Sequence, residues 1–221
     1  TQQVYVNDEQ DQIIDLALKQ YKKTQNTAYL GVCLNFFLGL RVGELIALQK
    51  NDFDEMVVKI SRQEIKEYEV IDGKRHRCGY KVVNYTKTLT SNRCIPLVSE
   101  AKKYYNMIIE ANENRGITSE FLFINDDGER MHDHAISNVI RRLNKKIETE
   151  QKSNHSIRKT CLSQMCASQQ LTEEEIRQFA GHKDYNTTKS YYLFPTKTID
   201  KRMDAYEKAL CRSVTKCNTA I

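Results

Sequence analysis

The chain has 221 residues, of which 34 are Lys or Arg and 29 are Asp or Glu, so its formal net charge is +5. Only 8 Gly and 2 Pro are present, well below the roughly 12% of average proteins, which excludes collagen-like and turn-rich all-β chains and predicts long helices. The longest mostly apolar stretch, residues 30–40, is shorter than the ~18 residues of a membrane-spanning helix, so no membrane partner is expected.

Apolar residues recur at helical spacing in most of the chain, whereas β-type patterns are confined to residues 56–97. An apolar, buried helix over 27–38 is expected to end near Gly39, and helix restarts after Arg41, which places Arg41 at a helix junction. Within 56–97 the turn signal Asp72-Gly73 predicts a hairpin in one small antiparallel sheet. The other helices are expected over residues 8–23, 102–112, 133–148, 156–168, 174–180, 187–193 and 198–210. The predicted fold is mainly α with a small antiparallel β-sheet (α+β), over residues 1–210, followed by a mobile tail over 211–221.

The positive charge is concentrated in one segment. Residues 56–103 hold 11 Lys or Arg and 5 Asp or Glu, a local charge of +6, which leaves 23 basic and 24 acidic residues elsewhere. A basic surface of this kind suggests a polyanion partner, nucleic acid first, although a solvated lysine-rich face explains the charge by itself equally well. The residues expected to face a phosphate backbone are Lys74, Arg75, Arg77, Lys81 and Arg93.

The seven cysteines include no CxxC pair, which is typical of reduced thiols and not of a disulfide framework or a zinc site. The first 12 residues lack the basic and apolar regions of a secretory signal. A cytoplasmic protein without a bound metal or cofactor is therefore expected.

Three short segments combine ionisable side chains with structural breaks. They are LGLRVGEL around Arg41, HSIRKT with His155 and Arg158, and AGHKDYNTTKSYY with His182, Tyr191 and Tyr192. Arg158 follows His155 by three positions, so on a helix both side chains lie on one face and can contact the same anion. The planar guanidinium of Arg158 matches two phosphate oxygens at once.

The order of these motifs resembles the tyrosine recombinases, also called phage integrases, over nearly the whole chain. The resemblance implies a catalytic domain over residues 1–210, and a helical core-binding domain that family members carry is not found before it. The segment TKTLTSNRCIPL resembles the family's β-hairpin, which makes Lys87 the catalytic lysine. Residues 61–85 are similar to an insertion found in integrases of conjugative transposons.

Together, the residue types and the resemblance assign each residue a role. Arg41 and Arg158 would bind the non-bridging phosphate oxygens, with Glu44 supporting Arg41. By resemblance, Lys87 would protonate the 5′-oxygen leaving group. His155 would assist proton transfer from the nucleophile, and His182 would hydrogen-bond the phosphate.

Two tyrosines compete as the nucleophile. Tyr191 and Tyr192 lie 9 and 10 residues after His182, and the conjugative-transposon-like layout slightly favours Tyr192. Either would form a covalent 3′-phosphotyrosine that keeps the energy of the cleaved bond.

The resemblance implies a recombinase that integrates and excises a mobile element or prophage in the bacterial cytoplasm or nucleoid. Its partners would be double-stranded DNA attachment sites, a homotetramer on DNA, and accessory DNA-bending proteins. Two alternatives remain: a type IB topoisomerase-like enzyme, and a non-catalytic DNA-binding regulator with a vestigial site.

Overall fold

The structure is a computed structural model, and it describes residues 4–6, 8–84 and 92–182. The helices are α1 (Glu9–Thr24), α2 (Ala28–Leu38), α3 (Val42–Ile46), α4 (Ser99–Asn114), α5 (Asp133–Lys146), α6 (Asn154–Ser168), α7 (Glu173–Ala180) and the 3-10 turn η1 (Lys50–Asp52). The strands are β1 (Val57–Ile60), β2 (Arg62–Ile71), β3 (Lys74–Asn84) and β4 (Arg93–Pro96). This architecture confirms the mainly α class with small antiparallel β-structure.

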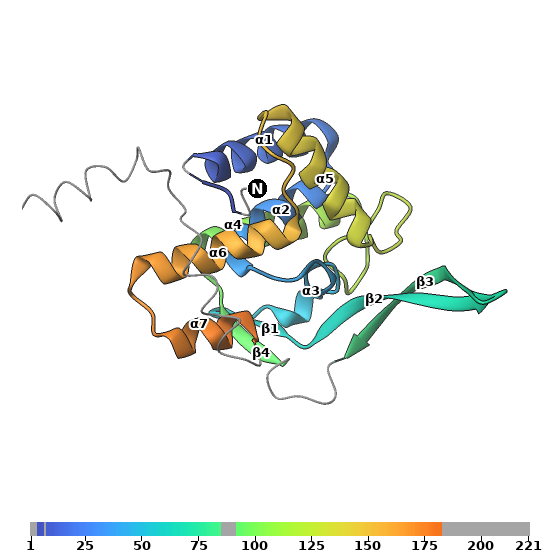
Figure 1. The fold of residues 1–221 in the computed structure, drawn as a ribbon. Coiled ribbons are helices and arrows are strands. Elements are labelled where there is room, and N and C mark those ends of the chain that lie inside the picture. The colour runs from blue at the N-terminus through green and yellow to red at the C-terminus, as the bar shows by residue number, and fades with distance from the viewer. Residues whose placement is uncertain (1–3, 7, 85–91, 183–221) are drawn as a thin grey trace, which may run out of the picture.

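Helix α2 forms the centre of the core because it is apolar around its whole circumference. All of its residues except Phe37 are buried. Helices α1, α4, α5 and α6 pack around it, as Figure 1 shows. Its C-terminal end, where Gly39 adopts the left-handed conformation with φ 58°, leads directly to Arg41 and α3. The core therefore fixes the position of the helix junction that the sequence predicts.

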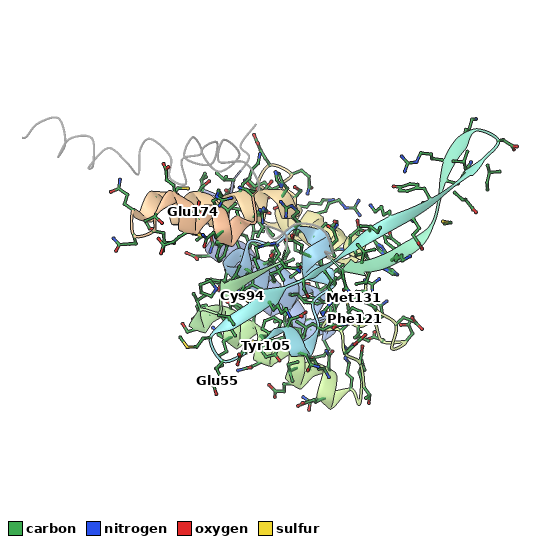
Figure 2. All side chains as sticks on the ribbon, turned by 90° about the horizontal axis from the view of Figure 1, so that it is seen from below. Glu55, Cys94, Tyr105, Phe121, Met131 and Glu174 are labelled. Atoms are coloured by element: carbon green, nitrogen blue, oxygen red, sulfur yellow. The ribbon has the colours of Figure 1, made fainter. Side chains whose placement is uncertain are left out.

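Within the described residues, the β-strands form two separate two-stranded antiparallel sheets, not the single sheet that the sequence predicts. Strands β1 and β4 pair with Val58 opposite Ile95, and both side chains are buried in the core. Strands β2 and β3 form a long hairpin that projects away from the helices (Figures 1 and 2). Beyond its base this hairpin is exposed on both faces, so no apolar surface holds it against the first sheet.

The hairpin turn is the predicted one. Asp72 and Gly73 both have positive φ, 50° and 71°, which suits a tight turn between right-handed twisted strands. The expected helices over 187–193 and 198–210 and the tail over 211–221 lie outside the described residues. No described helix is both long and apolar enough to cross a membrane.

Candidate functional site

Arg41 occupies the N-cap position of α3, where the chain is extended after α2 ends. Glu44, one turn later, reaches back: its Oε2 accepts the Arg41 backbone N–H at 3.0 Å and its Oε1 pairs with Arg41 Nη1 at 2.9 Å. The Arg41 side chain remains 47% exposed, whereas that of Glu44 is fully buried. The short helix thus presents one arginine outward from a buried carboxylate, as expected for Glu44.

Arg93 approaches the same carboxylate from β4. Its guanidinium contacts both oxygens of Glu44, at 2.9 and 3.1 Å, and its Nε donates to the Phe179 carbonyl of α7 at 2.9 Å. The Arg93 side chain is only 6% exposed. This placement does not fit the expectation that Arg93 faces DNA, because its guanidinium is directed at a buried carboxylate and a backbone carbonyl.

The carboxylate of Glu44 stays ionised in this setting. Burial by itself raises its pKa, but the hydrogen bonds and charge of Arg93, with the charges of Arg41 and Arg158, lower the pKa to about 2.

A glycine is required at position 181, beside the pair of Glu44 and Arg93. A Cβ there would lie 2.9 Å from Arg93 Nη1, and Gly181 has a positive φ of 66°.

Arg158 of α6 joins the ends of two other helices. Its guanidinium donates to the Gly39 carbonyl at 2.7 Å, to the Ala180 carbonyl at 2.6 Å and to His182 Nε2 at 3.0 Å. The residue is 1% exposed. Arg158 therefore closes a ring of contacts that runs from the end of α2 through Glu44 and Arg93 to the end of α7.

His182 is neutral within this ring. Burial, together with the positive charges of Arg158, Arg41 and Arg93, lowers its pKa to about 4. A guanidinium can only donate, so Nε2 of His182 is the acceptor and Nδ1 carries the proton. Three guanidinium groups around one carboxylate leave an excess of positive charge among the described residues of the ring, which favours an anionic ligand.

The lowered pKa of His182 predicts a pH-dependent stability. The unfolded state binds a proton near pH 6.5 and the folded state only near pH 4, so His182 stabilises the fold above pH 6.5 and loses this contribution as the pH falls toward 4. Between pH 7 and pH 4.5 we expect the unfolding free energy of the wild type to drop by about 2 kcal/mol more than that of His182→Asn. Urea unfolding of both proteins at several pH values measures the difference, and a difference that does not change with pH would contradict the assignment.

His155 lies in the first turn of α6, one turn before Arg158, and is exposed. Burial of part of its ring and the charges of Lys159, Arg158 and Arg41 lower its pKa. A neutral imidazole at an exposed position suits a proton acceptor.

The structure thus brings Arg41, Arg158 and His182 together and places His155 beside them. Lys74, Arg75, Arg77 and Lys81 lie apart from this site, exposed on β3 of the hairpin. Lys87, Tyr191 and Tyr192 lie outside the described residues.

Sequence reasoning missed the structural role of Arg93. The available signal was strand alternation: Arg93 and Ile95 lie two positions apart on β4, and a buried Ile95 directs Arg93 inward as well. An inward arginine needs a carboxylate, and Glu44 lies at the junction already singled out.

A cluster of arginines around one buried carboxylate, on a mainly helical domain, is typical of proteins that bind phosphate groups, and comparison with known families identifies the family. The chain matches the phage integrase family over residues 4–197 and belongs to that family. The integrase of Staphylococcus phage L54a is 27% identical, over 75% of this chain and 47% of the phage protein. The chain therefore spans about half the length of this relative.

Solved structures share the fold. The Tn1549 transposon integrase in complex with transposon right end DNA matches with a TM-score of 0.70 and 22% identity, over 96% of this chain and 67% of that one. XerA recombinase matches with a TM-score of 0.66 and 20% identity, over 93% of this chain and 62% of that one. These similarities confirm the recombinase catalytic-domain fold that the motifs predict.

Proposed function

We propose that the chain cleaves and rejoins DNA strands as a site-specific tyrosine recombinase, in the integration and excision of a mobile element or prophage. The observation that carries the proposal is the convergence of Arg41, Arg158 and His182 from three separate segments on one positively charged ring. A scissile phosphate is the anion that this set would bind, given the family to which the chain belongs.

In the proposed first step, the hydroxyl oxygen of Tyr192 or Tyr191 attacks the scissile phosphorus. A phosphorus–oxygen bond to tyrosine forms, the bond to the 5′-oxygen breaks, and a 3′-phosphotyrosine results. Lys87 would give a proton to the departing 5′-oxygen, and neutral His155 would accept the proton of the tyrosine. Attack by a 5′-hydroxyl reverses the step and rejoins a strand, so no nucleotide cofactor is consumed.

The arginines would stabilise the charge that develops on the phosphate in the transition state. Arg158 is held by two backbone carbonyls and Arg41 by Glu44, so both guanidinium groups are positioned before DNA arrives. Preorganised charges of this kind cost no reorganisation during the reaction. His182, protonated at Nδ1, would donate to a phosphate oxygen while its Nε2 supports Arg158.

The proposed partners follow from the same chemistry. DNA attachment sites at the ends of the element would be the substrate, bound by a homotetramer with accessory DNA-bending proteins, in the bacterial cytoplasm or nucleoid. Residues 1–210 would form the catalytic domain.

Covalent trapping tests the chemistry and identifies the nucleophile. On nicked duplexes that span the junction of element and flanking DNA, the wild type should give a covalent protein–DNA band on a denaturing gel. Tyr192→Phe should reduce this band to background and Tyr191→Phe should retain it, because only the attacking hydroxyl forms the bond. The two variants control for each other, since each removes one hydroxyl from neighbouring positions.

Other results would point to other functions. A band lost only in Tyr191→Phe would name Tyr191 as the nucleophile. Relaxed plasmid without recombinant joints would favour a type IB topoisomerase-like enzyme. DNA binding without any covalent band would contradict the enzymatic proposal and favour a regulator with a vestigial site.

A further inference from the structure

The hairpin β2–β3 has two chemically different faces. Residues directly opposite each other in an antiparallel pair share a face. Lys66 lies opposite Tyr80, and Tyr68 lies opposite Arg77; Arg75 joins them two positions along β3. We call these five residues the arginine–tyrosine face.

Because of a β-bulge, the residues of β3 do not alternate strictly between the two faces of the hairpin. The register shifts between Glu67 and Tyr68, so that β3 contains one more residue than its partner at this point. Alternation alone would place Lys81 on the face of Arg75 and Arg77, since all three have odd numbers. The bulge moves Lys81 to the opposite face, where Ile65 is its partner.

The arginines of the arginine–tyrosine face are held in place by aromatic rings. The Arg75 guanidinium lies 4.7 Å from the centre of the Tyr68 ring, and that of Arg77 lies 5.1 Å from the centre of the Tyr80 ring. Arg77 Nη1 also donates to the Tyr80 hydroxyl at 2.9 Å. Because the ring already restricts the arginine side chain, less conformational entropy is lost when the arginine binds a ligand.

The spacing of the two arginines suits a phosphate backbone. Arg75 and Arg77 are two positions apart on a strand, which separates them by about 6.8 Å. Successive phosphates along one DNA strand have a similar separation, so each arginine can contact its own phosphate. Both side chains are exposed and point away from the same side of the hairpin.

The opposite face carries mixed charges. It holds Glu67 and Glu69 together with Lys74, His76 and Lys81. The charges of the two carboxylates balance those of the two lysines, so this face lacks the excess of positive charge that attracts phosphates. We call these five residues the mixed-charge face.

A buried carboxylate at the hairpin base fixes how these faces are oriented. Glu64 accepts from Arg130 at 2.5 Å and from the backbone N–H of Asp133 at 2.9 Å, and it contacts His132 Nδ1 at 2.7 Å. Helix α3 approaches the same point closely, since a Cβ on Gly43 would lie 2.6 Å from the Glu64 carbonyl oxygen. These contacts tie β2 to the start of α5 and to α3, whose N-cap residue is Arg41.

Two further contacts come from the arginine–tyrosine face itself. Lys66 pairs with Asp133 at 2.9 Å, and the Tyr80 ring stacks on His132 with 4.1 Å between ring centres. The inner end of this face is therefore continuous with the protein body, while Arg75 and Arg77 extend outward from it.

We infer that the hairpin binds the phosphate backbone of duplex DNA through the arginine–tyrosine face alone, with Arg75 and Arg77 as the contacting residues. The mixed-charge face, including Lys74 and Lys81, does not contact DNA. This inference rests on the proposed function for the identity of the ligand, and it narrows the four hairpin residues expected from the sequence to two.

Two matched double variants test the inference. Arg75→Gln/Arg77→Gln and Lys74→Gln/Lys81→Gln each remove two positive charges from the same strand while keeping polar side chains. Equilibrium binding of the 221-residue chain to an intact duplex is measured over a range of salt concentrations. We expect the arginine variant to bind at least tenfold more weakly and the lysine variant to bind within about twofold of the wild type.

The salt dependence gives a second, independent readout. The slope of log K against log salt is negative, and loss of two phosphate contacts should make it shallower by about 1.8, whereas the lysine variant should keep the wild-type slope. Arg75→Lys/Arg77→Lys keeps the charge without the planar group and should lose part of the affinity. The inference would be overturned if Lys74→Gln/Lys81→Gln lost as much DNA affinity as Arg75→Gln/Arg77→Gln, or more.

Failure of the proposed function can be told apart from failure of this inference, because binding is measured without cleavage. A wild type that binds DNA but never becomes covalently attached would contradict only the recombinase proposal. A wild type that does not bind duplex DNA would overturn both.

Discussion

Replacing Arg41 by alanine should lower the rate of DNA cleavage by about 10²–10³-fold, the usual effect of removing one preorganised transition-state donor. The folded protein should lose less than about 1 kcal/mol of stability, because the side chain is 47% exposed and Arg93 still pairs with Glu44. Cleavage of nicked duplexes and urea unfolding measure the two effects, and much of the DNA affinity should remain.

Arg141→Ala is the matched control for Arg41. Arg141 is an exposed arginine on α5 that donates a hydrogen bond to Asn138 on the same helix, so its loss removes one charge without touching the ring around Glu44. Arg141→Ala should cleave at the wild-type rate. Near-wild-type cleavage by Arg41→Ala would remove Arg41 from the proposed catalytic set.

Replacing Glu44 by alanine should destabilise the protein by about 3–5 kcal/mol, the cost of leaving a buried charge without its partner. Arg93 is 6% exposed and pairs with both oxygens of Glu44, so its guanidinium would lose its counterion in a place that water hardly reaches. Arg41 would lose its anchor at the same time. Chemical denaturation measures the loss, and cleavage assays well below the unfolding midpoint should show reduced activity as well.

Glu174→Ala controls for the loss of an arginine-paired glutamate. Glu174 pairs with Arg177 at 2.7 Å, but it lies on the surface of α7, where Figure 2 labels it, and its side chain is 53% exposed. Solvent replaces such a pair at little cost, so this variant should unfold with almost the wild-type midpoint. Equal destabilisation by Glu44→Ala and Glu174→Ala would contradict the structural importance of the buried pair.

Local features of the fold were predictable because they depend on neighbouring residues. The end of α2 at Gly39 requires a left-handed residue, the hairpin turn requires Asp72-Gly73, and the start of α7 is set by Thr172 and Glu175. Each of these signals lies within a few positions of the structure that it determines. The division into two sheets was not predictable in this way, because it depends on which strands find an apolar surface.

The site shows the same distinction. The residue types Arg41, His155, Arg158 and His182 could be singled out from their motifs, and Glu44 from its place beside Arg41. The pairing of Glu44 with Arg93 joins positions 49 apart in the chain, and the contact of Arg158 with Gly39 joins positions 119 apart. No local pattern specifies such partners.

The sequence by itself determined the helices, the order of the motifs and the family to which they point, because periodicity, caps and turn residues act over a few positions. Only the tertiary structure decided that Arg93 supports the site from within, and that the bulge in β3 separates Lys81 from Arg75 and Arg77. Both depend on which atoms meet when distant segments pack, and a shift of one residue in a strand changes the face on which every later side chain lies.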